Sequence, residues 1–124
     1  MGQVYAEIEL RNASRADLEP ITVRALADTG SLMMCIPEHL AVQLSLQRQR
    51  RVEVMLADGR WVDEIDYVGP ILVRFADRSC FVGAFVMGNE VLLGAVPMED
   101  MDLVIDPGLG QVKGRYPEGP RHRV

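Results

Sequence analysis

The stretch Ile21-Thr22-Val23-Arg24-Ala25-Leu26-Ala27-Asp28-Thr29-Gly30 decides the fold. Its first seven residues are mostly apolar or β-branched, a composition that favours a strand. The strand leads directly into Asp28, and Gly30 lets the backbone bend where a bulkier residue would be strained. Thr29 adds a small hydroxyl group that can form hydrogen bonds with its surroundings. We therefore predict an apolar strand that ends in a loop presenting Asp28.

Another strand precedes this one. Between Val4 and Arg11 apolar residues alternate with polar ones, which is the period of a half-buried strand. Residues 12–20 are polar and turn-like, so the two strands form a predicted hairpin. The rest of the chain also consists of short apolar segments separated by turn signals. We expect further strands over residues 52–56, 61–68, 71–75, 80–87, 91–93 and 103–105, and short helices over residues 37–46 and 96–101.

Few helices and many short strands predict an all-β, barrel-like domain. Two turn signals shape it. Ala57-Asp58-Gly59-Arg60 marks the tip of a hairpin, because the Gly of an Asp-Gly pair accepts a positive φ. The returning strand begins at Trp61, and we expect Gly69-Pro70 to end it.

At 124 residues the chain is long enough for one domain with its own core. We assign residues 1–112 to this domain and interpret residues 113–124 as a polar tail that we expect to be mobile. The net charge of −5 argues against nucleic acid as a partner, since binding phosphate requires a basic face. No apolar run approaches the ~20 residues that span a bilayer, so we expect no membrane partner.

Cys35 and Cys80 both lie among apolar residues, which suits buried thiols in a reducing compartment rather than a disulfide framework. The N-terminus lacks the charged and apolar regions of a secretory signal, so we predict a cytoplasmic protein. His39 and His122 match no zinc pattern, and the sequence contains no glycine-rich nucleotide motif. We expect neither a metal nor a cofactor.

Leu92-Leu93-Gly94 completes the pattern, because it follows the predicted hairpin and precedes a short helix. Together with Asp28-Thr29-Gly30 and the hairpin, it resembles the retropepsin-like aspartic proteases, in particular their small bacterial and archaeal homodimeric type. The resemblance covers about residues 4–106. It implies a retropepsin-like acid-protease barrel with one or two short helices, and an aspartic endopeptidase that acts on peptide or protein substrates.

The resemblance also implies roles for single residues. Asp28 would be the catalytic aspartate, and Thr29 would form hydrogen bonds between subunits in a loop completed by Gly30. Ser31 would donate a hydrogen bond to the Asp28 carboxylate. Leu92-Leu93-Gly94 would be the buttress behind this loop. The flap over the substrate would consist of Ala57, Asp58, Gly59 and Arg60 at its tip, with Trp61 beside them.

One catalytic aspartate in a short chain implies a homodimer. Hydrolysis by paired carboxylates requires one group as base, to activate water, and another as acid, to polarise the scissile carbonyl. Two aspartates about 3 Å apart share one proton, because both cannot remain ionised. The chain contains one such loop, so a second subunit must provide the second Asp28.

A different class of function is the alternative: a catalytically inactive dimer of the same fold that binds peptides or serves dimerisation. Two departures from the retroviral pattern motivate it. The predicted flap tip is not glycine-rich, and Gly94 is followed by Ala95-Val96-Pro97 instead of an Arg and an Asp or Asn. Peptide cleavage by the pure protein discriminates between the two functions.

Overall fold

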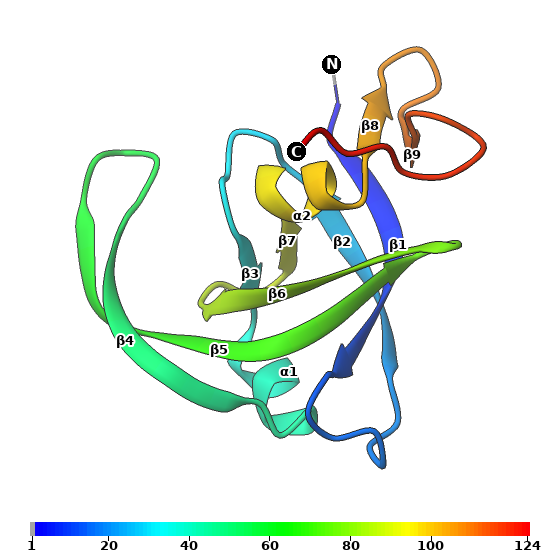
Figure 1. Cartoon of the computed structure of the whole chain (residues 1–124). Coiled ribbons are helices and arrows are strands. Elements are labelled where there is room, and N and C mark those ends of the chain that lie inside the picture. Colours follow the sequence, from blue (N-terminus) through cyan, green and yellow to red (C-terminus); the bar gives the residue numbers. More distant parts are fainter. Residues whose placement is uncertain (1) are drawn as a thin grey trace.

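The structure, a computed structural model, describes residues 2–124, which form nine strands and two short helices (Figure 1). The strands are β1 (Val4–Asn12), β2 (Ile21–Ala27), β3 (Met34–Ile36), β4 (Gln47–Met55), β5 (Trp61–Phe75), β6 (Arg78–Val86), β7 (Val91–Leu93), β8 (Leu103–Asp106) and β9 (Gln111–Gly114). The helices are α1 (Glu38–Gln43) and α2 (Ala95–Asp100).

Six strands close into a barrel in the order β1-β2-β7-β3-β6-β5, because β1 also pairs with β5. Its interior is filled by apolar side chains, among which Leu10, Met34, Ile71 and Leu93 have no exposed surface. Burial of such side chains is the main favourable contribution to folding. The prediction of an all-β barrel with short helices is confirmed.

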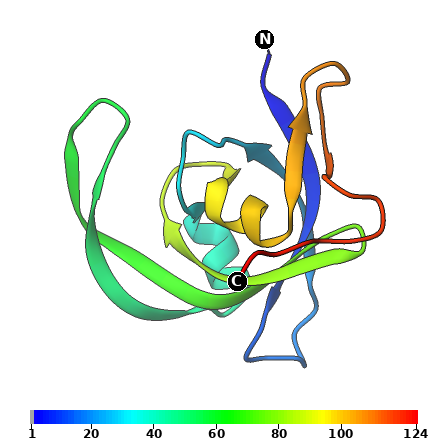
Figure 2. The same ribbon diagram turned by 45° about the horizontal axis from the view of Figure 1, so that its top comes forward.

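The hairpin of β4 and β5 extends away from this barrel. It projects on the left in Figure 1, and Figure 2 shows the same projection from a second direction. Met55 is opposite Trp61 at its end, and Gly59 in the connecting turn has a φ of 87°. This conformation is easy for glycine and strained for other residues. The Asp-Gly pair therefore forms the turn that we predicted.

Strand β7 lies between β2 and β3, which are far from it in sequence. It runs parallel to β2, with Leu92 opposite Leu26, and antiparallel to β3, with Leu92 opposite Cys35. Because β2 and β7 are parallel, the loop after β2 and the start of α2 after β7 emerge at the same edge of the sheet. Strand β3, which we did not predict, holds β7 on its other side.

Strand β5 continues through Gly69-Pro70 to Phe75, so the expectation that this pair ends the strand is wrong. Pro70 has no N–H to donate, and the register with β6 shifts between Val68 and Ile71. Such a bulge accommodates a proline inside a paired strand. The side-chain amide of Gln49 donates to the Gly69 carbonyl at 2.9 Å, which supplies a further bond at this irregular point.

The guanidinium of Arg78 connects β6 to the C-terminal residues. Arg78 is 4% exposed, and its Nη1 donates to the carbonyls of Met101 at 3.2 Å and Asp102 at 2.9 Å. Its Nη2 donates to the carbonyl of Tyr116. Strand β9 includes Lys113 and Gly114, residues that we assigned to the tail. The first part of that segment thus contacts the barrel through β9 and Arg78.

The carboxylate of Asp102 makes a second connection to the same segment. It accepts a hydrogen bond from the N–H of Arg121 at 2.9 Å and pairs with the guanidinium of Arg115 at 2.8 Å. The N–H of Arg121 and the charge of Arg115 lower the pKa of Asp102, because both stabilise its ionised form. The turn after α2 is therefore joined to the C-terminal residues by one hydrogen bond and one ion pair.

Candidate active site

Backbone hydrogen bonds form a tight loop around Asp28, which follows β2 directly. The N–H of Asp28 donates to the carbonyl of Leu93 at 3.0 Å, and the N–H of Ser31 donates back to the Asp28 carbonyl at 3.1 Å. The N–H of Gly30 donates to the Asp28 carboxylate at 3.0 Å. A Cβ on Gly30 would lie 3.1 Å from that carboxylate oxygen, so this position favours glycine. These bonds orient one carboxylate at the end of a barrel strand.

Gly94 and the start of α2 support this loop from behind. Gly94 packs against the loop backbone so closely that an added Cβ would overlap the Met33 carbonyl and lie 2.7 Å from that of Ser31. The N–H groups of Ala95 and Val96 donate to the carbonyls of Ser31 and Leu32, at 2.8 Å and 2.9 Å respectively. Free N–H groups in the first turn of a helix need such partners. The helix is thus anchored to the Asp28 loop.

Pro97, in the first turn of α2, fits this arrangement because its missing N–H would have no partner within the helix. The segment Ala95-Val96-Pro97 therefore connects to the loop through backbone groups.

The Ser31 hydroxyl has a different partner from the one that the resemblance implies. Its Oγ donates to the Met33 carbonyl at 3.4 Å, within the same loop. The Asp28 carboxylate instead accepts its bond from the backbone of Gly30. Thr29 is exposed between them.

A groove of about 610 Å³ lies between the Asp28 loop and the β4–β5 hairpin. Its walls come from the loop, from the end of β4 and the hairpin turn, and from the barrel strands and the residue after β6. The lining residues are Asp28, Gly30, Ser31, Leu32, Met33, Cys35, Glu53, Val54, Met55, Leu56, Ala57, Phe85, Met87 and Leu92. A concave, mostly apolar site with few polar groups is the usual form of a binding site.

Cys35 is the one thiol in this groove wall among residues 2–124. Burial raises the pKa of Cys35, because the thiolate loses hydration in the barrel wall. A neutral buried thiol is a poor nucleophile. Cys35 is therefore not a candidate nucleophile of this groove.

The hairpin turn occupies the place that we predicted for the flap tip. The N–H of Leu56 donates to the Arg60 carbonyl at 2.8 Å, which closes the turn. Arg60 also forms an ion pair with Asp58 at 2.8 Å, and both side chains are exposed. Trp61 follows with 64% of its surface exposed.

The structure brings only part of the predicted set together. Asp28, Gly30, Ser31, Ala57 and Leu92 border the same groove. Leu93 and Gly94 lie behind the loop, where their backbone contacts hold it. Thr29, Asp58, Gly59, Arg60 and Trp61 do not line the groove.

Several lining residues were missed by sequence reasoning. Four of them, Glu53 to Leu56, precede the predicted turn directly, so the hairpin pattern itself was a signal for them. Phe85 lies near the end of β6, Met87 follows that strand, and neither has a local motif. Only the pairing of β6 with β3 brings them to the groove.

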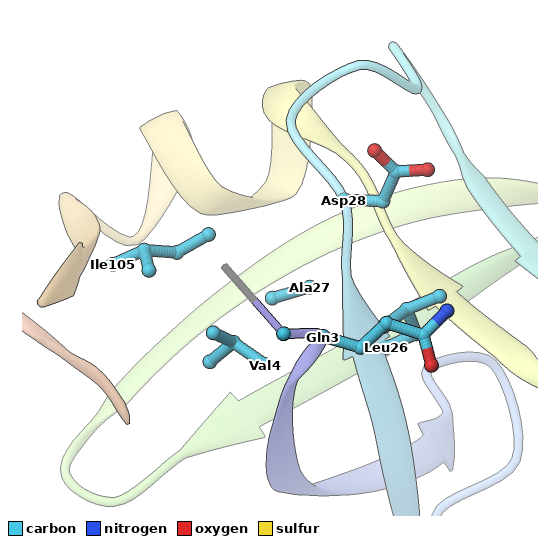
Figure 3. Close-up of a pocket in the computed structure, with 7 residues that line it drawn as sticks. Gln3, Val4, Leu26, Ala27, Asp28 and Ile105 are labelled. Atoms are coloured by element: carbon cyan, nitrogen blue, oxygen red, sulfur yellow. The ribbon is translucent and has the colours of Figure 1, made fainter. Parts of the chain in front are cut away.

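A smaller recess of about 270 Å³ lies on another side of Asp28, near the start of β1. Figure 3 shows Val4, Ala27 and Ile105 around it, while the carboxylate of Asp28 points away from Ile105. The recess lacks the Gly30 and Ser31 walls and the hairpin that border the larger groove. The larger groove is therefore the candidate active site.

Residues 2–124 contain no group of three or more His, Cys, Asp or Glu side chains placed to hold a metal ion. Neither described helix is long and apolar enough to cross a membrane.

The closed barrel, the insertion of β7 between β2 and β3, and the projecting hairpin define a retropepsin-like fold. The chain is similar to the retroviral protease-like domain of Ddi1 from Leishmania major, with a TM-score of 0.60 over 97% of this chain and 94% of that one. The two sequences are 14% identical, so the likeness concerns the fold. The simian foamy virus (mac) protease aligns over 74% of this chain and 90% of its own, with 14% identity and a TM-score of 0.47.

No protein-family model matches the sequence. No curated protein sequence matches it significantly either.

Proposed function

We propose that this chain is an aspartic endopeptidase, which hydrolyses peptide bonds through two Asp28 carboxylates, one from each subunit of a homodimer. The observation that carries the proposal is the position of Asp28. It lies on a loop supported from behind by Gly94 and α2, and it borders a groove whose other side is the β4–β5 hairpin. A carboxylate held in a fixed orientation beside a groove is what acid–base hydrolysis of a bound peptide requires.

The homodimer follows from the chemistry. One carboxylate must act as base toward the attacking water while a carboxylic acid polarises the scissile carbonyl. The Asp28 loop supplies one such group per chain, on an exposed edge where Thr29 is accessible to a second subunit. A two-fold axis beside this loop would place the two Asp28 side chains together, because such an interface uses the same patch twice.

The hairpin would serve as the flap in this mechanism. Closure of Leu56 and Ala57 over a peptide would exclude bulk water from the pair of aspartates, which strengthens their electrostatic interactions with the substrate. The flap residues Asp58 and Arg60 pair with each other at the tip, outside the groove.

The test is cleavage of a diverse peptide library by the purified protein, followed by mass spectrometry. Asp28→Asn should lower the cleavage rate by about 10²- to 10⁴-fold or more, because the amide can act neither as base nor as acid. Its dimer mass should be unchanged. Asp77→Asn is the matched control, since Asp77 is exposed in the turn between β5 and β6, outside the groove.

Undiminished cleavage by the Asp28→Asn variant would contradict the proposal. So would a strictly monomeric wild-type chain at high protein concentration. The rate should also be highest at acidic to neutral pH, because a pair of aspartates needs one shared proton. A rate that climbs steadily above about pH 8 is incompatible with that requirement.

A further inference from the structure

We propose that Glu53 sets the substrate class of the groove by binding a Lys or Arg side chain of an extended peptide; this inference rests on the proposed function. Asp28 and Glu53 are the two charged residues among those that line the groove, and both are acidic. A groove with low-dielectric walls and charge of one sign attracts ligands of the opposite sign. A basic side chain near Glu53 is therefore favoured over an acidic one.

Glu53 is available for such a contact, whereas two arginines of the same hairpin already have acidic partners. Arg51 forms an ion pair with Asp66 at 3.3 Å, and Arg60 forms one with Asp58 at 2.8 Å. Within residues 2–124 the carboxylate of Glu53 has no such ion pair, although its side chain is exposed at the groove. An incoming cation does not have to displace an existing partner there.

The free edge of β4 provides the backbone contacts for an extended peptide. Within the described part of the chain, β4 is the last strand of its sheet and pairs only with β5. The last three residues of β4, Glu53 to Met55, all border the groove, although alternate side chains of a strand point to opposite faces. The strand therefore meets the groove with its edge, where unpaired N–H and C=O groups can accept an added strand.

The remaining walls suit large apolar side chains. Most of them are aliphatic, aromatic or thioether groups, namely Leu32, Met33, Val54, Met55, Phe85, Met87 and Leu92. Methionine is flexible and polarizable, so three methionines in one groove tolerate apolar side chains of different shapes. The substrate class is thus an extended peptide that has apolar residues beside Asp28 and a Lys or Arg beside Glu53.

The experiment uses the full chain and a library of ten-residue peptides in which one position at a time carries Lys, Gln or Glu among mixed apolar residues. Cleavage is measured as kcat/KM. Binding is measured separately with the same peptides, in which the scissile peptide bond is reduced and cannot be cleaved. At one position the wild type should prefer Lys over Gln by about two- to five-fold, the range for an exposed ion pair. Glu53→Gln should abolish that preference, and Glu53→Lys should turn it into a preference for Glu.

Glu38→Gln is the matched control, because Glu38 is exposed on α1, does not line the groove and carries the same charge. It should retain the wild-type preference. The preference should also shrink in 1 M salt, where charges are screened beyond ~3 Å. If Glu53 had a purely structural role, the Lys-over-Gln preference would not depend on salt. Glu53→Lys would then not reverse the preference either.

The outcomes separate this inference from the proposed function. If peptides are cleaved but wild type and Glu53→Gln show the same Lys-to-Gln ratio, the role of Glu53 is refuted while the peptidase stands. If no peptide is cleaved but the uncleavable Lys peptide binds more tightly in a Glu53-dependent manner, the role of Glu53 stands and the peptidase is refuted. If the peptides are neither cleaved nor bound, the role of Glu53 and the peptidase are both refuted.

Discussion

Gly94 lies directly against the carbonyl group of Met33, so that a methyl group at position 94 would overlap its oxygen. The neighbouring N–H of Ala95 donates to the Ser31 carbonyl at 2.8 Å. Close approach of the two backbones thus couples α2 to the loop that carries Asp28. The Asp28 loop and the start of α2 are far apart in sequence. They pack against each other because a glycine at position 94 leaves room for both backbones.

Gly94→Ala should therefore destabilise the protein and displace the Asp28 loop. Overlap with backbone atoms cannot be relieved by a side-chain rotation, so we expect a loss of about 1–3 kcal/mol of unfolding free energy, or more. Urea denaturation measures this loss, and peptide cleavage should fall with it. Gly2→Ala is the control, since nothing lies within 4 Å of a Cβ there. Equal stability of the two variants would contradict the close packing.

Arg78→Met should destabilise the protein by removing a buried donor. The carbonyls of Met101, Asp102 and Tyr116 all accept hydrogen bonds from this guanidinium and would lose them together. A buried carbonyl that loses its donor costs about 1–3 kcal/mol, so we expect a loss of at least that size. Thermal and urea unfolding measure the change. Arg74→Met, on the exposed side of β5, should stay near the wild type, and a similar small effect at Arg78 would refute its role.

Asp102 should contribute to the loss of stability in acid. Its pKa is lowered in the folded protein, so its contribution is present above the unfolded-state pKa of about 3.9 and disappears as the pH falls through the folded-state pKa. Asp102→Asn should make unfolding free energy less dependent on pH in that window. Asn is suitable because Asp102 has a φ of 53°, which Asn tolerates. Parallel pH profiles of both proteins would contradict the pKa shift.

The thiol of Cys80 should be inert in the native protein. Burial, and secondarily the charge of Asp100, raises the pKa of Cys80 from 9.0 to about 12. The thiolate, which is the reactive form, is then about 10³-fold rarer at neutral pH than in an exposed cysteine. In a Cys35→Ala variant, Ellman's reagent should react with Cys80 only after unfolding by guanidinium. Native reaction at the rate of the unfolded chain would be inconsistent with this burial.

The elements that were predicted correctly have local causes. The run from Ile21 to Ala27 is apolar and β-branched, and Asp58-Gly59 forms its turn through the positive φ of glycine. Both signals lie within a few residues, so no knowledge of the fold was required. The Asp28 loop was recognisable for the same reason, because strand, carboxylate and glycine are adjacent in the chain.

The elements that were missed depend on distant partners. Strand β3 has three residues and exists because β6 and β7 flank it. Strand β9 has one buried apolar residue, Val112, and within residues 2–124 it pairs only with β8. Gly69-Pro70 was misjudged because a bulge against β6, invisible in the sequence, keeps the strand paired around it.

Arg78 and Glu53 were missed for another reason. The partners of Arg78 are backbone carbonyls, which every residue carries, so no sequence motif marks them. Glu53 looks like an ordinary exposed position in an alternating strand. It belongs to the candidate site only because the β4–β5 hairpin borders the same groove as Asp28.

A mixing experiment tests the central claim, that one active site takes an Asp28 from each of two chains. Wild type and Asp28→Asn chains are unfolded together, refolded at varied ratios, and assayed for peptide cleavage. If both aspartates are required, activity follows the square of the wild-type fraction, and an equal mixture retains about one quarter of the wild-type activity, the statistical share of dimers with two intact chains. If a carboxylate of the same chain, such as Glu53, is the partner of Asp28, the equal mixture retains about one half, and the shared site is refuted.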